Sequence, residues 1–322
     1  MEQPTFSAIQ TTRLGVLSAV LESEVGLALR LLRDIMDQGL GFEAVLSEVL
    51  IPIQADIGHR WSLGEYRVSE EHAVTATMET LVASLAGSIE GDPDAPRVVV
   101  VCAEGDTHSL PARMVAAFLS LRGWRVQFLG TGIPADDLGE HLADGEFHAL
   151  VLACAMRAHL RGARACIEAS HRAGVPVIVG GRAFGSDDSI AVSLGADGWS
   201  NSFDDIDAVL HTWHPDPAKA EAIVQQPGPE LAMLTKRHRS IVESALGSLP
   251  EGITHEELDL LLDNLASSVL VGNPDPLIQH ASWRDALWTT RVPTASLLEA
   301  VADVIDPTAE QIHRHLATAI AV

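Results

Sequence analysis

Five short, almost uninterrupted apolar runs alternate with helical stretches in the middle of the chain, and this alternation constrains the fold more than any other feature. Runs without polar alternation are typical of a parallel sheet that is buried on both faces. The order of strands and helices predicts a doubly wound, flavodoxin-like α/β domain over residues 97–215. The expected strands are RVVVVCA (97–103), RVQFLG (125–130), ALVLACA (149–155), PVIVGG (176–181) and DGWSN (197–201).

The segments on either side of this domain have helical spacing. Residues 1–89 hold apolar positions at a period of 3.6, with one long helix expected over 13–39, and they predict a four-helix bundle. Residues 216–229 are rich in Pro and polar residues and are expected to form a linker. Residues 230–322 return to helical spacing and predict an all-α domain, so the chain is an α/β multidomain protein.

Charge and cysteine usage exclude several classes of function. The formal net charge is −23, and such a surface repels polyphosphate, so we expect no direct binding to DNA. Three cysteines without a CxxC pair argue against a disulfide framework or a zinc cluster and fit a reducing cytoplasm. The first twelve residues lack a signal-peptide pattern, and no apolar run approaches the roughly 20 residues of a membrane span. We therefore expect a cytoplasmic protein without a membrane anchor.

The strands of the middle domain end in small, polar or turn-forming residues. Ligands of open α/β sheets bind outside the carboxyl ends of the strands, so these residues are candidates for a binding site. Taken singly, each glycine also fits an ordinary turn, and the histidine after the first strand also fits a capping or surface position. Together they leave room for a long ligand along four strand ends. The candidates are Asp106, Thr107, His108, Ser109, Gly130, Thr131, Ala153, Ala155, Gly180 and Gly181.

The stretch DTHSLPARMVAAFLSLRGWRVQFLGTGIP, with VLACAM and VIVGGRAFG downstream, resembles the cobalamin-binding domain of the methionine synthase and photoreceptor type. The family motif is Asp-x-His-x-x-Gly, followed by Ser-x-Leu or a variant and then Gly-Gly. The resemblance implies that His108 displaces dimethylbenzimidazole as the lower axial cobalt ligand, with Asp106 orienting its ring. Pro111 replaces the last glycine of the first motif and fits the first turn of a helix. Ala153 replaces the serine and leaves room for the nucleotide tail.

The stretch WSLGEYRVSEEH resembles the adenosyl-capping bundle of light-sensing cobalamin receptors through its Trp-x9-Glu-His spacing. The resemblance implies that Trp61 packs over the upper face of the corrin and that Glu71 and His72 hold the adenosyl ribose, with an apolar contribution from Val68. Taken alone, the Trp is also an ordinary core aromatic and the Glu a first-turn acid. Gene-regulating receptors carry a histidine after the Trp as the upper ligand after illumination. Ser62 stands there, so a bis-histidine photoproduct is not expected.

The stretch QHASWRDALW in the last domain places aromatic and polar side chains on one helix face. The order of bundle, cobalamin domain and helical domain resembles the photocobilins, which pair adenosylcobalamin with a bilin in a globin-like C-terminal domain. The resemblance implies biliverdin or a related bilin, held noncovalently because no cysteine follows Cys166. Core tryptophans and surface histidines remain the alternative explanation. The candidate bilin contacts are His280, Trp283, Arg284 and Trp288.

The leading functional hypothesis is a non-enzymatic light sensor with adenosylcobalamin and a bilin as chromophores. Photolysis of the cobalt–carbon bond would trigger a domain rearrangement, with output to an unidentified signalling protein or through a homodimer. A corrinoid methyl carrier of a methyltransferase system shares the bundle, the Asp-x-His motif and the sheet, but it needs no adenosyl cap. A flavodoxin-like scaffold without corrinoid leaves His108 and Trp61 unexplained together. Adenosyl-radical mutases need a barrel of about 250 residues, and no such pattern occurs in this sequence.

Overall fold

The computed structural model describes residues 4–87, 89, 93–212, 228–287 and 292–321. Most of the expected linker at 216–229, and Trp288 of the expected bilin site, lie outside the described residues. The chain divides into two compact units, Met1–Val100 with His108–Gly130, and Val101–Thr107 with Thr131–Val322. None of the described helices combines the length and the apolar character that a bilayer crossing requires.

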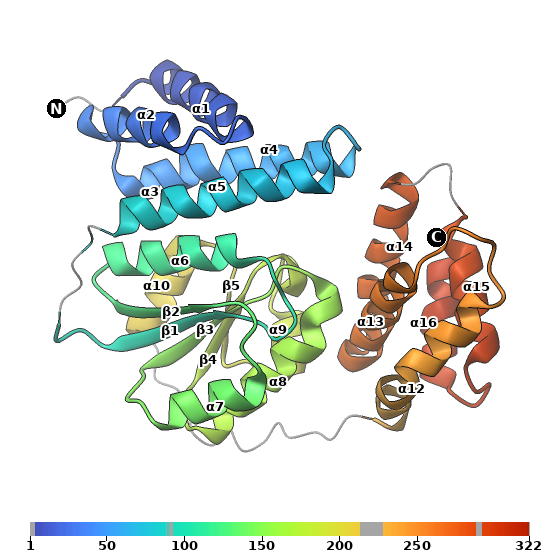
Figure 1. The fold of residues 1–322 in the computed structure, drawn as a ribbon. Coiled ribbons are helices and arrows are strands. Elements are labelled where there is room, and N and C mark those ends of the chain that lie inside the picture. The colour runs from blue at the N-terminus through green and yellow to red at the C-terminus, as the bar shows by residue number, and fades with distance from the viewer. Residues whose placement is uncertain (1–3, 88, 90–92, 213–227, 288–291, 322) are drawn as a thin grey trace. The chain divides into compact units, whose positions relative to one another are not determined.

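The predicted sheet is confirmed as a five-stranded sheet with the order β2-β1-β3-β4-β5 (Figure 1). β3 pairs with β4 and β4 with β5 in parallel, with Leu150 opposite Val177 and Ile178 opposite Gly198. This is the flavodoxin-like order, in which the direction of winding reverses between β1 and β3 and creates a ligand-binding crevice there. The strands are β1 (Arg97–Cys102), β2 (Arg125–Gly130), β3 (Ala149–Ala153), β4 (Val177–Gly180) and β5 (Gly198–Ser200).

Helices follow each strand of the sheet, as the alternating pattern predicts. α6 packs on β2, α8 on β3 and β4, and α10 on β5, so the apolar strands are covered. Pro111 lies in the first turn of α6, where a missing N–H costs no helical hydrogen bond. The elements are α6 (Ser109–Leu121), α7 (Ala135–Ala143), the 3₁₀ turn η2 (Arg157–His159), α8 (Leu160–Arg172), the 3₁₀ turn η3 (Arg182–Phe184), α9 (Ser189–Leu194) and α10 (Phe203–Thr212).

The N-terminal residues form helices as predicted, but the single helix expected over 13–39 is wrong. The chain breaks between α1 (Phe6–Leu21) and α2 (Val25–Asp37), where Ser23 has a φ of 57°. This left-handed residue reverses the chain, so that α1 and α2 pack against each other instead of continuing as one rod. The helical period continues across the break, and periodicity alone therefore conceals the turn.

The second half of the N-terminal region is a helical hairpin. Its first arm is continuous helix through α3 (Phe42–Ala44), a π-helical stretch η1 (Val45–Leu50) and α4 (Ile51–Ser62). Pro52 follows the π-helical stretch, and the wider turns there accommodate a proline that cannot donate a hydrogen bond. The second arm is α5 (Val68–Ala86), which packs along α6 of the same unit.

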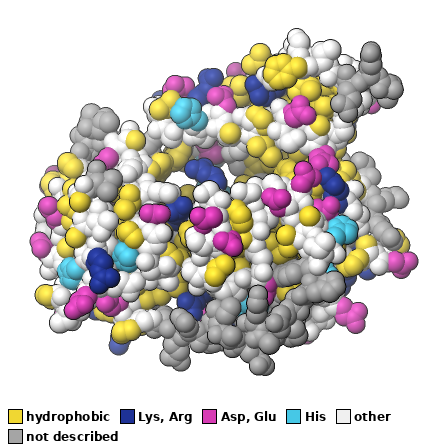
Figure 2. All heavy atoms as spheres, turned by 180° about the vertical axis from the view of Figure 1, so that it is seen from behind, with side chains coloured by type: hydrophobic (Ala, Val, Ile, Leu, Met, Phe, Trp, Pro, Cys, Tyr) yellow, Lys and Arg dark blue, Asp and Glu magenta, His cyan; other side chains and the backbone are white. Residues whose placement is uncertain are grey.

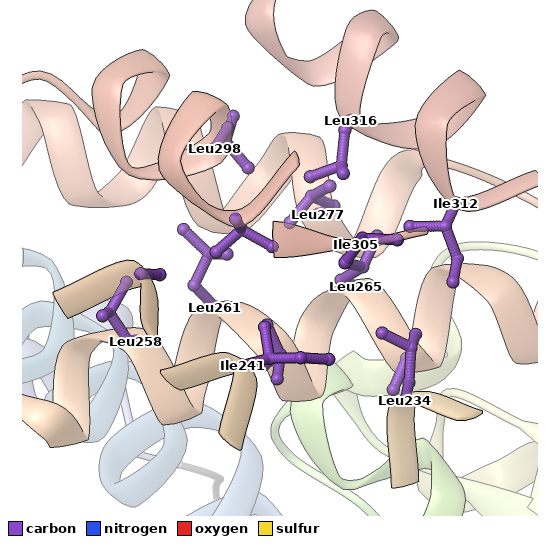
Figure 3. Close-up of a cluster of buried hydrophobic side chains, with 14 of the residues drawn as sticks. Leu234, Ile241, Leu258, Leu261, Leu265, Leu277, Leu298, Ile305, Ile312 and Leu316 are labelled. Atoms are coloured by element: carbon purple, nitrogen blue, oxygen red, sulfur yellow. The ribbon is translucent and has the colours of Figure 1, made fainter. Parts of the chain in front are cut away.

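The residues after 228 form the predicted all-α domain, while its globin-like character stays a prediction. Its core consists of leucine, isoleucine, valine and alanine side chains, with Leu261 and Leu265 of the second helix at its centre (Figure 3). Full burial of such a side chain stabilises a fold by about 2 kcal/mol. The helices are α12 (Pro229–Leu246), α13 (His255–Val271), α14 (Asp275–Leu287), α15 (Thr294–Val304) and α16 (Glu310–Ile320).

Candidate functional site

Asp106 lies in the turn that follows β1 and is buried, with 1% of its surface exposed. Its backbone N–H donates to the Ala103 carbonyl at 2.9 Å, which closes a tight turn directly after β1. Its Oδ2 accepts the N–H of Ala155, which follows β3, at 2.5 Å. A buried carboxylate thus connects the ends of the two strands at the point where open α/β sheets bind ligands.

A second polar side chain, which the sequence reasoning missed, accompanies Asp106. Nδ1 of His159, in the η2 turn, lies 3.8 Å from Oδ1 of Asp106. A Cβ on Gly105 would lie 3.5 Å from Cδ2 of His159, so the imidazole lies against the turn that carries Asp106. The sequence shows only that a histidine follows the third strand by a few residues. Its spacing does not reveal that the side chain contacts the turn after the first strand.

His108 is exposed and directly precedes α6, in the N-cap position of that helix. The neighbouring Thr107 is also exposed, whereas Ser109 is half-buried. The Ser109 hydroxyl donates a hydrogen bond to the carboxylate of Glu79 in α5. The imidazole of His108 is therefore accessible, and the first residue of its helix is fixed to the N-terminal helices.

Among the other predicted strand-end residues, two glycines have a structural explanation of their own. Gly181 has a φ of +104°, and a Cβ there would lie 2.4 Å from the Cys154 carbonyl oxygen. A Cβ on Gly180 would lie 2.8 Å from the Ser200 carbonyl oxygen. Close backbone packing therefore already explains both glycines. The half-buried strand ends are Gly130, which has a φ of +78°, Thr131, Ala153 and Ala155.

The predicted cap residues gather at the turn between α4 and α5. Trp61 is half-buried in the last turn of α4, and Val68 begins α5 with 56% of its surface exposed. Nδ1 of His72 lies 2.9 Å from Oε2 of Glu71 and 2.9 Å from the Val68 carbonyl oxygen. Both atoms are acceptors, so Nδ1 of His72 is the nitrogen that donates to them. Oε1 of Glu71 accepts from the Thr75 hydroxyl at 2.8 Å.

One face of α5 connects these cap residues to the strand-end site. Val68, Glu71, Thr75 and Glu79 follow one another at three- or four-residue spacing and therefore share that face. Glu79, at its far end, accepts the hydrogen bond from Ser109. The same helix face thus carries the predicted adenosyl cap and contacts the residue next to His108.

The described residues of the predicted bilin site are mostly internal to the C-terminal helices. His280 is 8% exposed, and its ring centroid lies 5.8 Å from that of Trp283. Burial, together with the positive charge of Arg284, lowers the pKa of His280 to about 4, so the ring is neutral near pH 7. Among the described residues, Nε2 of His280 has no hydrogen-bond partner.

Arg284 is 1% exposed, and its guanidinium is used in internal contacts. Nη1 donates to the Val292 carbonyl at 2.8 Å and to the Thr294 hydroxyl at 3.1 Å, and Nη2 lies 3.3 Å from Oε1 of Glu257. A ligand carboxylate at this arginine would have to compete with Glu257. The arginine therefore has a structural role in joining α13, α14 and the start of α15.

The donor set of the strand-end site fits a corrinoid better than a metal held by protein alone. Within the described part of the chain, no three His, Cys, Asp or Glu side chains gather in a metal-binding arrangement. Burial, together with nearby Asp106, raises the pKa of the Cys154 thiol well above its usual value and keeps it protonated. A corrin ring brings four nitrogen ligands of its own, so one accessible imidazole is sufficient as the protein ligand.

Two protein-family models match the chain. A B12 binding domain matches residues 96–205, and a second B12 binding domain matches residues 15–86. The first match contains the strand-end site, and the second contains the turn between α4 and α5 with its cap residues. The two matches support cobalamin as the cofactor of this chain.

Two transcriptional repressors of known name are similar to parts of this chain. The HTH-type transcriptional repressor CarH of Myxococcus xanthus is 32% identical over 114 residues, 33% of this chain and 36% of the relative. The HTH-type transcriptional repressor CarA of the same organism is 26% identical over 134 residues, covering 42% and 43%. The chain thus spans less than half the length of each of these relatives.

A solved structure gives the fold. The monomethylamine corrinoid protein of Methanosarcina barkeri superposes with a TM-score of 0.53 at 19% identity, covering 61% of this chain and 95% of that protein. Residues 15–86 and 96–205 therefore match B12 binding domains in sequence, and the chain shares the fold of a corrinoid protein.

Proposed function

We propose that this chain is a light sensor that binds adenosylcobalamin with His108 as the lower cobalt ligand. The observation that carries the proposal is the buried Asp106, fixed between β1 and β3 two residues before an exposed histidine. When bound, the cofactor supplies a cobalt–carbon bond that visible light breaks. Asp106 orients the imidazole and holds its second ring proton, because a carboxylate fixed by a backbone N–H cannot turn away.

The cap residues have the second role in the proposal. Trp61 and Val68 offer apolar surface to the upper face, and Glu71, held by Thr75 and His72, offers a carboxylate oxygen to a ribose hydroxyl. Loss of the adenosyl group would remove the contact partner of this α5 face. Because the same face bonds to Ser109, its packing on α6 is where we expect the first structural response.

Regulation fits the chain better than catalysis. Both matched repressors have regulatory names, which supports a sensor that is not an enzyme. On the face that Figure 2 shows, the described Lys and Arg side chains lie singly or in small groups among acidic and apolar ones. This surface and the net charge of −23 favour output to a partner protein or a second copy of the chain over direct DNA contact.

A noncovalent bilin, biliverdin or a relative, completes the proposal as a second chromophore in the C-terminal helices. The resemblance in domain order supports it, and so does the buried His280, whose Nε2 has no hydrogen-bond partner among the described residues and whose ring lies beside Trp283. Arg284 contributes to the fold at this position, so we assign the chromophore contacts to the histidine and the tryptophan.

The test is the absorption spectrum of the full chain loaded with adenosylcobalamin in the dark and after green light. We expect a spectrum of the form without dimethylbenzimidazole on cobalt, and a change on illumination. His108→Ala should lose that form, whereas His211→Ala, an exposed histidine on α10, should retain it. Binding of methylcobalamin with no response of the adenosyl form to light would favour the methyl carrier. A colourless protein would overturn the proposal.

The bilin is tested by the same experiment with biliverdin added. A separate red band that His280→Leu removes would support the second chromophore. A spectrum with cobalamin bands alone would limit the chain to a sensor with one chromophore.

A further inference from the structure

The C-terminal helix α13 lies against the segment that follows β3, within one compact unit of the chain. The hydroxyl of Ser267, which is completely buried, lies 3.5 Å from the carbonyl oxygen of Ala158. Nη1 of Arg161 lies 3.9 Å from Oδ1 of Asp263. The helix therefore contacts the backbone and a side chain on either side of His159.

The same segment is packed tightly on the turn that carries Asp106. A Cβ on Gly162, in the first turn of α8, would lie 1.9 Å from the Glu104 carbonyl oxygen. The imidazole of His159 covers Gly105 and reaches Asp106 at 3.8 Å. Residues 157–162 are thus held between the candidate cobalt-ligand turn on one side and α13 on the other.

Asp263 is the charged group of α13 that faces this segment. Burial raises the pKa of Asp263, and charge interactions with His238 of α12, Arg161 and His159 oppose that rise. Nδ1 of His238 lies 3.9 Å from Oδ1 of Asp263, and its Nε2 lies 2.9 Å from Oδ1 of Asp259. Two helices of the C-terminal domain therefore fix a carboxylate beside the histidine that contacts Asp106.

We propose that Asp263 is a positioning residue for the cobalt ligand, acting through His159 on Asp106. This inference rests on the proposed function, because it requires His108 to bind cobalt. It gives the C-terminal helices a part in setting the lower face of the corrin. Since coupling between two sites is reciprocal, a change at the cobalt ligand would also alter the contact between residues 157–162 and α13.

The test compares Asp263→Asn with Asp259→Asn in the full chain. The control removes the carboxylate of Asp259, one turn earlier on the same helix, which also contacts His238 but is 48% exposed. We expect Asp263→Asn to weaken binding of hydroxocobalamin by about tenfold, the lower end for groups that support a metal ligand. Asp259→Asn should bind within about twofold of the parent chain, and Asp263→Glu, which keeps the charge, should recover most of the affinity.

Two further readouts separate positioning from a general loss of structure. In nitrogen-15 spectra of the imidazoles of the cobalamin-free chain, the His159 signals should shift in Asp263→Asn and stay in place in Asp259→Asn. His159→Ala should weaken binding at least as much as Asp263→Asn, and the double variant should bind no more weakly than His159→Ala alone. Additive losses, or unchanged His159 signals, would overturn the inference.

The outcomes also separate this inference from the function on which it rests. If His108→Ala binds hydroxocobalamin as the parent does, the proposed cobalt ligand is wrong. If His108→Ala weakens binding and Asp263→Asn leaves both affinity and the His159 signals unchanged, only the positioning role is wrong.

Discussion

Ala155 donates its backbone N–H to Oδ2 of Asp106 at 2.5 Å, although the two residues lie 49 positions apart in the chain. The bond connects the ends of β1 and β3, the two strands between which the sheet changes its direction of winding. A backbone donor survives substitution of its own side chain. The carboxylate is therefore the half of this pair whose role can be tested.

Asp106→Asn should weaken cobalamin binding by about 10- to 100-fold, the range found when a group that supports a metal ligand is removed. The amide can still accept from Ala155, but it carries no charge to stabilise the N–H on the second ring nitrogen of the ligand imidazole. Spectral titration with hydroxocobalamin measures the effect. Asp136→Asn, which alters an aspartate that is 93% exposed in the same domain, should leave the affinity unchanged. Equal affinities for the two variants would contradict the role of Asp106.

Gly181→Ala should lower the free energy of unfolding by more than the cost of a left-handed backbone alone, which is about 1–2 kcal/mol. The new Cβ would also lie 2.4 Å from the Cys154 carbonyl oxygen, so the ends of β3 and β4 must separate. Gly174→Ala is the matched control, because its φ is +74° and nothing lies within 4 Å of its Cβ position. Urea unfolding of both variants measures the difference. Equal losses of stability would show that the ends of β3 and β4 separate without a cost in free energy.

Local features of the sequence predict the strands of the sheet correctly but miss a break within one expected helix. The strands were found to within two residues at each end, because apolar β-branched runs end at glycine or a turn. The helix expected over 13–39 was wrong because its apolar period continues through Ser23, and a single left-handed residue has no periodic signature. α5 begins at Val68, where Glu70 reaches back to accept the Arg67 N–H at 2.7 Å.

The parts of the site that escaped prediction depend on contacts between distant segments. Glu79 meets Ser109, and His159 meets Asp106, across 30 and 53 positions respectively. Spacing along one strand or helix cannot report such pairs. Arg284 shows the same limit, since helical spacing places it on a face with His280 but does not show that Glu257 of α13 occupies that face.

Arg284→Met should destabilise the chain by about 3–5 kcal/mol, because it leaves the buried carboxylate of Glu257 without its opposite charge. The two side chains are 1% and 7% exposed, so water cannot replace the lost charge. The double variant Arg284→Met with Glu257→Met should recover part of the loss. Arg239→Met is the control at an exposed pair with Glu243 and should cost less than about 1 kcal/mol. Urea unfolding checks the three variants, and a small loss for Arg284→Met would leave this arginine available to a ligand.

Acid should destabilise the chain through His280 between pH 6.5 and pH 4. Burial lowers its pKa in the folded chain to about 4, whereas the unfolded imidazole binds a proton near pH 6.5. The unfolded state therefore carries more protons in this window, so stability is complete above pH 6.5 and is lost as the pH falls. The loss from this residue reaches about 3 kcal/mol at pH 4 and about 2 kcal/mol at pH 5.

The measurement is the free energy of unfolding in urea at pH 7.5 and pH 5.0. His280→Leu should reduce the difference between the two values by about 2 kcal/mol, because leucine does not titrate and fills the same apolar surroundings. Burial also lowers the pKa of His315, so part of the dependence should persist in this variant. His255→Asn, which replaces an exposed imidazole at the start of α13, should keep the full difference. A His280→Leu chain with the pH dependence of the parent would show that this imidazole takes up a proton without resistance in the folded state.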